Sequence, residues 1–215
     1  MSRCRSIRKL SLRLFLVGLA LLAATGCQTI MTPLPPGRDV HLGPGEGILV
    51  VETFSNSDIE VLRLVPRPSG PGRRLSDLPQ GHQVNLVVLP EGNYRWSRIA
   101  LLGLTINRRR YPVRWRLDSG EQWQVSVKAG QVNYPGMVVL HRSSWSYLSY
   151  RVLNRSGEFL TLIEELFPGL LTQFEARYGG AGRDDFLEYY RETLVSHGPV
   201  KATSDEEATV APGDF

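Results

Sequence analysis

The sequence has few of the residues from which proteins build reactive or cross-linked sites. Only Cys4 and Cys27 are cysteines among 215 residues. The four histidines are scattered, and no His-Glu-x-x-His, paired-cysteine or clustered-carboxylate motif with metal-ligand spacing occurs. A Gly-x-Ser-x-Gly elbow and a glycine-rich phosphate loop are also absent. These absences predict a protein without catalytic residues, metal or cofactor, although a Ser, His and Asp brought together only by folding stay an alternative.

Long apolar runs are also missing, apart from one near the N-terminus. Leu14 to Ala24 is an apolar run of about eleven residues, whereas a spanning helix needs about 20. The small residues Thr25 and Gly26 follow it, and Cys27 comes next. The segment before the run contains five basic and no acidic residues: Arg3, Arg5, Arg8, Lys9 and Arg13. A basic segment, a short apolar core and small closing residues are typical of an export signal.

The end of this segment, Ala24-Thr25-Gly26-Cys27, resembles the lipobox of bacterial lipoproteins, with alanine where that family most often has leucine. The resemblance implies a signal peptide over residues 1–26, cleavage between Gly26 and Cys27, a diacylglycerol on the Cys27 sulfur and usually a further acyl chain such as palmitate. Two or three chains make a stable tether. Because Gln28 follows instead of aspartate, the resemblance implies the periplasmic face of the outer membrane. An ordinary secretory signal with a coincidental cysteine is the alternative.

Removal of residues 1–26 changes the net charge and the number of cysteines, and with them the partners and cross-links that the composition predicts. The full chain has 25 basic and 21 acidic residues and a pI near 9.3. The remainder keeps 20 basic and the same 21 acidic residues, so its overall charge does not indicate a nucleic-acid partner. Cys4 is also lost, and Cys27 then has no cysteine to pair with. We therefore expect a packed core, not disulfides, to stabilise the domain.

The composition after Cys27 changes at residue 47. Residues 27–46 are rich in proline and glycine, which predicts an extended tether that lifts the domain off the bilayer. Residues 47–155 alternate β-rich runs with turn residues, and Tyr111 to Leu117 has the clearest period of two. We expect an antiparallel β-sandwich of about seven or eight strands, with Pro66 to Gly81 as a surface loop. The expected strands are 48–54, 58–65, 82–89, 93–99, 111–117, 123–127, 132–141 and 145–153.

Two turn motifs carry a second resemblance. Leu89-Pro90-Glu91-Gly92-Asn93-Tyr94 and the segment from Ala129 to Gly136 resemble strand entries of the prealbumin-like β-sandwiches of uncharacterised bacterial lipoproteins. The likeness covers about residues 47–153. It implies a sandwich fold, and sandwiches of this kind are known mainly as binding or structural modules.

The C-terminal part has a helical pattern. Ser156 is the expected cap of a helix broken at Pro168, after which an apolar stripe continues to Tyr178. Asp185 and Glu188 resemble a capping box that opens a last helix. We expect the helical element, residues 156–196, to cover an open face of the sandwich, with docking on a partner as the alternative. Residues 197–215 are polar and acidic, which predicts a disordered tail.

Charge is segregated within the β-rich part. Between Arg63 and Arg116 there are eleven arginines and only two acidic residues, Asp77 and Glu91. Guanidinium groups on one face can hold the phosphates or carboxylates of an anionic glycan or lipid, or those of an acidic envelope protein. A solvated surface and protection of strand edges are the alternatives. The candidate anion-binding residues are Arg108, Arg109, Arg110, Arg114 and Arg116.

These observations together predict a lipid-anchored envelope protein that acts as a non-enzymatic binding or assembly module. A hydrolase acting on envelope polymers is the alternative function.

Overall fold

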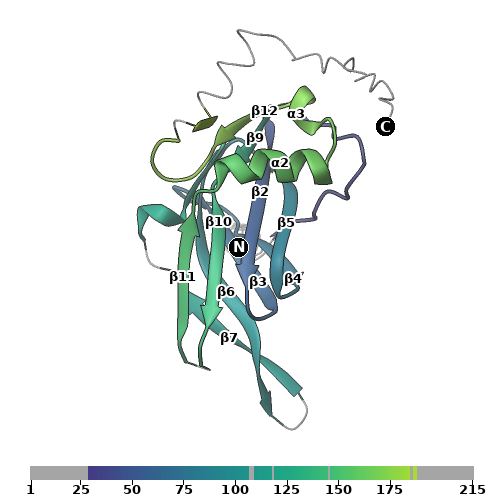
Figure 1. Ribbon diagram of the computed structural model, residues 1–215. Helices are drawn as coiled ribbons and strands as arrows, with labels where there is room; N and C mark the ends of the chain where they lie inside the picture. The colour runs from purple at the N-terminus through teal and green to yellow at the C-terminus, as the bar shows by residue number, and fades with distance from the viewer. Residues whose placement is uncertain (1–28, 107–108, 118, 145, 185, 188–215) are drawn as a thin grey trace, which may run out of the picture.

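The computed structural model describes residues 29–106, 109–117, 119–144, 146–184 and 186–187, and this part of the chain is mainly β (Figure 1). Two α-helices and a short 3-10 helix accompany the strands. The described elements are β1 (Thr29–Ile30), β2 (Glu46–Ser55), β3 (Ile59–Arg67), β4 (Arg73–Leu78), β5 (Gly81–Pro90), β6 (Gly92–Ile106), β7 (Arg109–Arg116), η1 (Glu121–Trp123), β8 (Gln124–Val127), β9 (Gln131–Tyr134), β10 (Met137–Arg142), β11 (Leu148–Leu153), α2 (Ser156–Leu166), α3 (Leu170–Gln173) and β12 (Glu175–Tyr178).

The strands form two six-stranded sheets. Sheet A has the order β1-β4-β3-β6-β7, and β8 pairs with the first residues of β6. Sheet B has the order β11-β10-β2-β9-β12, and β5 pairs with the other edge of β2. Four of the pairings are parallel: β1 with β4, β2 with β9, β2 with β10, and β9 with β12. Both sheets are therefore mixed, and the expected antiparallel arrangement is found only in part.

The parallel pairs of sheet B arise where the chain passes from one sheet to the other. β8 lies in sheet A, and after the turn at Lys128 to Gly130 the chain enters sheet B as β9. β9 and β10 then follow the same edge of β2, with Ile48 opposite Val132 and Glu52 opposite Met137. The chain thus enters sheet B by a crossover and not by a hairpin, which permits the parallel direction.

The inward faces of the two sheets share one core. Leu62, Leu64 and Trp96 of sheet A and Leu49 and Val51 of sheet B belong to it, and none of these side chains is more than 2% exposed. Trp123 of η1 is also fully buried and lies 5.3 Å from the ring of Tyr150. Face-to-face packing of alternating apolar residues is what positions the outward side chains of each strand.

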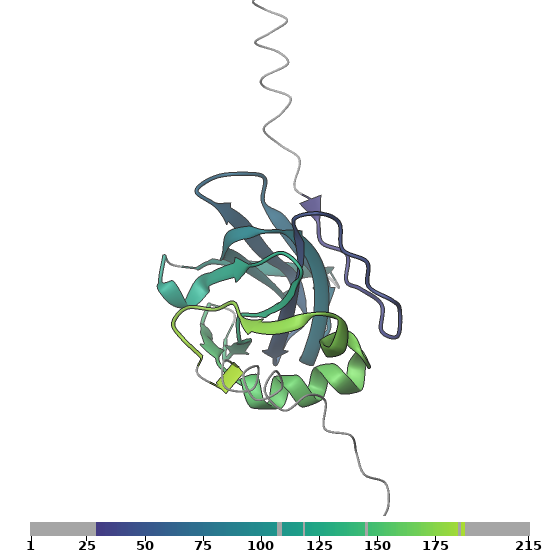
Figure 2. The same cartoon turned by 90° about the horizontal axis from the view of Figure 1, so that it is seen from above.

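A second apolar cluster lies on the outer face of sheet B. Ile48 and Val50 alternate with the core residues of β2, and Phe159 and Ile163 of α2 pack onto them. The ring of Phe159 stacks on that of Tyr134, with a centroid distance of 4.3 Å. Figures 1 and 2 show α2 and α3 along this side of the molecule. We call α2, α3 and the segments packed with them the helical layer.

The helical layer is shorter than its apolar pattern predicts. α2 ends at Leu166, and Gly169, with a φ of 76°, turns the chain into the short α3. From Phe174 the backbone is extended, and residues 175–178 form β12, parallel to β9. The stripe expected to stay helical to Tyr178 therefore ends as a strand, because a free edge of β9 offers backbone hydrogen bonds. Asp185, Glu188 and the tail from residue 197 lie outside the described residues.

The segment that precedes β2 packs along the domain. Met31 is buried, and the Leu34 amide donates to the carbonyl of Leu86 over 2.7 Å. Leu34, Val40 and Leu42 pack against the apolar cluster of the helical layer. The described part of the expected tether, residues 29–46, thus lies on the β-domain, where β1 pairs with β4 and Leu34 bonds to the outer edge of β5.

The proline- and glycine-rich stretch from Pro66 to Gly81 is not a plain loop. β3 continues to Arg67, and β4 pairs antiparallel with it. Leu75 and Leu78 are buried in the shared core. These two leucines bury enough apolar surface to order a strand inside a sequence that reads as turns.

Candidate anion-binding face

The outer face of sheet A is where the arginines gather. On β3, Leu62 and Leu64 point into the core, so Arg63 between them points outward. On β7, Trp115 packs against the core, and the exposed Arg114 and Arg116 on either side of it point outward. The alternation of β3 and β7 therefore places Arg63, Arg114 and Arg116 on the same surface.

A β-bulge brings Arg98 to this surface as well. Leu64 pairs with Trp96 and Arg63 pairs with Arg98, which leaves Ser97 as the extra residue of β6. Trp96 and Ile99 both point inward, with exposures of 2% and 0%. Without the bulge, strict alternation would place Arg98 on the core side. Bulges often redirect a side chain in this way.

The strand registers then align four arginines across four neighbouring strands. Arg74 of β4 pairs with Arg63 of β3, Arg63 pairs with Arg98 of β6, and Arg98 pairs with Arg116 of β7. We call these four residues the arginine row. Paired side chains on one face have Cβ atoms about 4.5–5.5 Å apart, and like charges at that separation destabilise a sheet.

The fold does not neutralise the arginine row within the described residues. None of its four guanidinium groups forms an ion pair with a described carboxylate. The Nε atoms of Arg63 and Arg74 are buried and have no hydrogen-bond acceptor in the described part of the chain. A Cβ at Gly72 would lie 2.8 Å from Arg63 Nε, so glycine provides the room that this guanidinium occupies.

Other arginines of the protein are used by the fold itself. Arg142 on β10 donates from its two terminal nitrogens to the carbonyls of Leu102 and Gly103, over 3.2 and 2.9 Å. Arg155, just before α2, pairs with Glu158. The arginine row differs from these two residues because no acceptor or carboxylate of the described chain engages it.

The row is suited to an extended array of anions. Strands lie about 4.8 Å apart, so four neighbouring strands spread the charges over about 14 Å. A guanidinium group offers a planar pair of donors that matches the oxygens of phosphate or carboxylate. An open sheet surface with several such groups fits several phosphates or carboxylates side by side better than one small molecule.

The sequence-based candidates are only partly brought together. Arg114 and Arg116 lie on the arginine-bearing face. Arg109 and Arg110 belong to the far end of β7, opposite Ile106 and Thr105, and Arg108 lies outside the described residues. The candidate set missed Arg63, Arg74 and Arg98. Alternation on β3 gives the outward direction of Arg63, but the bulge and the registers that align the row are set by tertiary pairing.

A second polar cluster lies under the helical layer, around Glu52. This carboxylate is 3% exposed and points outward from β2 toward the helical layer. Its Oε2 accepts a hydrogen bond from the Tyr134 hydroxyl, and its Oε1 lies 2.7 Å from His82 Nε2. Arg155 Nη1 lies 3.9 Å from the same oxygen. Burial, together with the hydrogen bond and negative charge of Glu52, raises the pKa of Tyr134 above its ordinary value.

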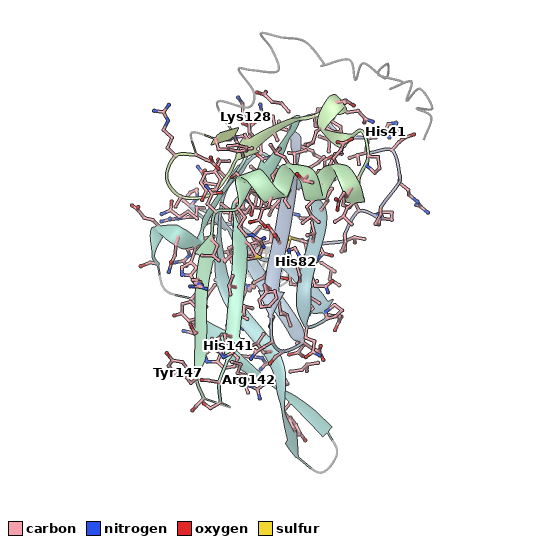
Figure 3. All side chains as sticks on the ribbon, viewed as in Figure 1. His41, His82, Lys128, His141, Arg142 and Tyr147 are labelled. Atoms are coloured by element: carbon pink, nitrogen blue, oxygen red, sulfur yellow. The ribbon has the colours of Figure 1, made fainter. Side chains whose placement is uncertain are left out.

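The Glu52 cluster is the closest approach to a catalytic constellation in the described chain. A histidine beside a buried carboxylate is a known way to orient a general base. However, among the described residues no serine hydroxyl is hydrogen-bonded to a histidine. Figure 3 places His82 below α2, while His41 and His141 lie toward opposite ends of the molecule. The cluster satisfies a buried charge, and its partners hold α2 to β2 and β9.

A third polar cluster, around Asp184, holds the start of α2. Asp184 accepts hydrogen bonds from Ser156, from Asn154 and from the backbone amides of Phe186 and Leu187. Burial alone raises the pKa of Asp184, but these donors outweigh it, so the pKa lies below its ordinary value. Asp184 therefore accepts from the amides of the two residues Phe186 and Leu187, and Ser156 donates to Asp184 instead of capping α2.

Asp184 lines two cavities, of about 330 and 310 Å³. Lys128, Arg177 and Arg183 line the larger one, together with Asp184. The Asp184 carboxylate already accepts four hydrogen bonds from the protein, so we assign it a structural role.

Several sequence-based expectations concern features beyond these sites. Gly26 and Cys27 lie outside the described residues. In the described part of the chain, no group of three or more His, Cys, Asp or Glu side chains has a geometry that could hold a metal ion. No described helix has the length and apolar content needed to cross a bilayer.

Comparisons of the chain with protein-family models, with curated proteins and with solved structures find no match.

Proposed function

We propose that this chain is a lipid-anchored, non-enzymatic envelope protein that binds an anionic envelope component on the outer face of sheet A. The observation that carries the proposal is the arginine row, four guanidinium groups aligned by strand register without an ion partner in the described chain. In this proposal the two sheets act as a variant β-sandwich that serves as a rigid binding platform.

The energetic cost of the row supports a ligand over a merely solvated surface. Each directly opposed like-charge pair costs about 0.2–1 kcal/mol, and the row contains three such pairs. An anion held between neighbouring guanidinium groups would convert each repulsion into two attractions. A solvated surface gains nothing from bringing the four charges together, and mixed charges are the usual surface pattern.

The proposed location follows from the N-terminal sequence. A basic segment, a short apolar core and the Gly26-Cys27 pair support lipidation of Cys27 and placement on the periplasmic face of the outer membrane. The phosphates and carboxylates of envelope glycans and lipids are the anions available there. The function proposed for sheet A is recognition of such groups.

A binding experiment tests the anion site. The full chain, purified in detergent, is titrated with a deacylated, phosphate-bearing lipopolysaccharide oligosaccharide and with the same oligosaccharide after dephosphorylation. The variant Arg74→Gln/Arg98→Gln/Arg116→Gln should bind the phosphorylated form at least about tenfold more weakly, since each exposed charge pair is worth about 0.5 kcal/mol. Arg63 is left intact because it packs against Gly72.

The matched control removes three positive charges elsewhere. Arg38→Gln/Arg151→Gln/Arg177→Gln changes the net charge by the same amount but leaves sheet A untouched. An equal loss of affinity in this control would show that only net charge matters. Binding that ignores both phosphate and salt concentration would also refute the proposal, because exposed charge pairs are screened by salt.

The anchor is tested in cells that express the chain and are fed a fatty-acid probe. Cys27→Ala should lose both the label and membrane association, whereas Cys4→Ala should keep both. Label that persists in Cys27→Ala would refute the lipid anchor.

A further inference from the structure

The first described strand lies directly beside the arginine row. Thr29 and Ile30 form β1, which pairs with Arg73 and Arg74 of β4. The Thr29 amide donates to the carbonyl of Gly72 over 3.1 Å, and the Met31 amide donates to that of Arg74 over 2.8 Å. β1 lies on the side of the molecule away from α2 and α3 (Figure 2).

The chain between the lipidation cysteine and β1 is very short. Cys27 and Thr29 are two residues apart, so their Cα atoms can be at most about 7 Å apart. The headgroup layer on each side of a bilayer is about 5–8 Å thick. With lipid on Cys27, Thr29 therefore stays within or next to the headgroup layer. A free linker of about 20 residues would instead separate its ends by about 25 Å.

Charge and polarity around β1 favour contact with the leaflet. Ile30 is 58% exposed and lies beside Arg74, so an apolar side chain and a guanidinium group face the interface together. The helical layer on the opposite side exposes the carboxylates of Glu164 and Glu165 on α2, whereas that of Glu158 is paired with Arg155. A negatively charged surface attracts the first side and repels the second.

We infer that the arginine row docks on the lipid phosphate groups of the leaflet that holds the anchor, so that sheet A lies against the bilayer and the helical layer faces the aqueous space. This inference rests on the proposed function, because it uses both the Cys27 anchor and the anion site. It narrows the ligand from any envelope anion to the phosphates of the leaflet. The short connection to Cys27 raises their local concentration at the row.

The orientation is tested with the lipidated full chain reconstituted into vesicles. A fluorophore is attached at Ser76→Cys, on the outer face of sheet A, or at Thr161→Cys, on the exposed side of α2. Spin-labelled headgroups quench a nearby fluorophore. In vesicles with phosphatidylglycerol, quenching should be strong at residue 76 and weak at residue 161.

Arginine variants connect this orientation to the row. Arg98→Gln/Arg116→Gln should lower the ratio of docked to undocked protein by about 25-fold, since each basic residue near an anionic surface contributes about fivefold. Arg98→Lys/Arg116→Lys should keep most of the quenching because it keeps the charge. Arg38→Gln/Arg151→Gln removes two charges elsewhere and should leave the quenching unchanged.

Different failures identify which proposal is wrong. Equal quenching at residues 76 and 161, or quenching at residue 76 that the Gln variant does not reduce, overturns the docked orientation. If the oligosaccharide still binds through the row in that case, the proposed anion site stands. If substitutions in the arginine row change neither the affinity for the oligosaccharide nor the quenching on vesicles, both proposals fail. A chain without lipid on Cys27 overturns the orientation and the proposed lipid anchor, but it leaves the proposed anion site standing.

Discussion

The charged side chains on the outer faces of the two sheets differ in whether they have partners within the chain. On sheet B, one buried carboxylate, Glu52, has the hydroxyl of Tyr134, the ring of His82 and the guanidinium of Arg155 around it. On sheet A, the four guanidinium groups of the arginine row have no described carboxylate. A charge that serves the fold can be recognised by its partners inside the chain. The proposed binding of an anion rests on like charges that are aligned without such partners.

The two faces also differ in what covers them. The helical layer buries the apolar side chains on the outer face of sheet B, so that face contributes to the stability of the domain. The outer face of sheet A is a surface, and its opposed arginines lower the stability. Substitutions on the first face should therefore destabilise the protein, whereas selected substitutions on the second should stabilise it. The following four expectations, from the largest effect to the smallest, test this difference.

Phe159→Ala should lower the free energy of unfolding by about 3–5 kcal/mol, because it removes a buried ring and leaves a cavity against Tyr134. Urea unfolding of the full chain, followed by tryptophan fluorescence, measures the loss. Phe54→Ala is the matched control: Phe54 lies on the same face of β2 but is 48% exposed, so its loss should cost much less. A cost below about 1 kcal/mol for Phe159→Ala would mean that the helical layer is not part of the cooperative core.

Glu52→Gln should lower the free energy of unfolding by about 1–3 kcal/mol, since the amide keeps the shape but leaves buried donors poorly satisfied. The same denaturation experiment measures it. Glu91→Gln, in an exposed turn, should change stability by less than about 0.5 kcal/mol. Equal values for the two variants would contradict the role assigned to the Glu52 cluster.

Asp184→Asn tests the charged contact at the start of α2 through pH. The pKa of Asp184 is lowered in the folded protein, so its stabilising contribution is full above the unfolded value of about 3.9. The contribution is lost as pH falls through the lower folded pKa. Melting temperatures measured from pH 7 to pH 2.5 should show a gap between the native chain and the variant that narrows below about pH 4.

The exposed Asp39→Asn controls for the loss of one carboxylate. A gap between the native chain and Asp184→Asn that stays constant with pH would show that the hydrogen bonds of Asp184, and not its charge, hold the helix.

Arg98→Gln should raise the free energy of unfolding by about 0.5 kcal/mol, because it removes two opposed like-charge pairs, with Arg63 and with Arg116. The gain should shrink in high salt, where the repulsion is already screened. Arg151→Gln on the exposed side of β11 should give no such gain. A loss of stability in Arg98→Gln would show that the arginine row stabilises the folded protein.

The sequence predicted the elements whose patterns are local. The alternation from Tyr111 to Leu117 corresponds to β7, and the apolar spacing after Ser156 corresponds to α2. It did not predict β4 or β12, because each depends on an edge supplied by a distant strand. The parallel pairing of β2 with β9 and β10 depends on the path of the chain between the two sheets. No local residue pattern predicts that path.

The candidate site was predictable to a similar extent. The excess of arginine over acidic residues between residues 63 and 116 is visible in the sequence, and Arg114 and Arg116 were correctly placed on one strand face. The alignment of Arg63 with Arg98 requires an extra residue at Ser97, which alternation alone does not reveal. Glu52 was missed because it stands in an apolar strand and its partners come from β5, β9 and the segment before α2.

The pairing of β2 has a consequence for how the protein folds. Ile48 and its partner Val132 are about 84 residues apart in the sequence, whereas β6 and β7 meet across a short connection. The β6–β7 hairpin can form early, but one edge of β2 stays open until the chain beyond Tyr134 has folded back. Topologies dominated by such distant pairings fold in about milliseconds to seconds. During that interval the open edge can pair with another chain, so the refolding yield should fall as the protein concentration rises.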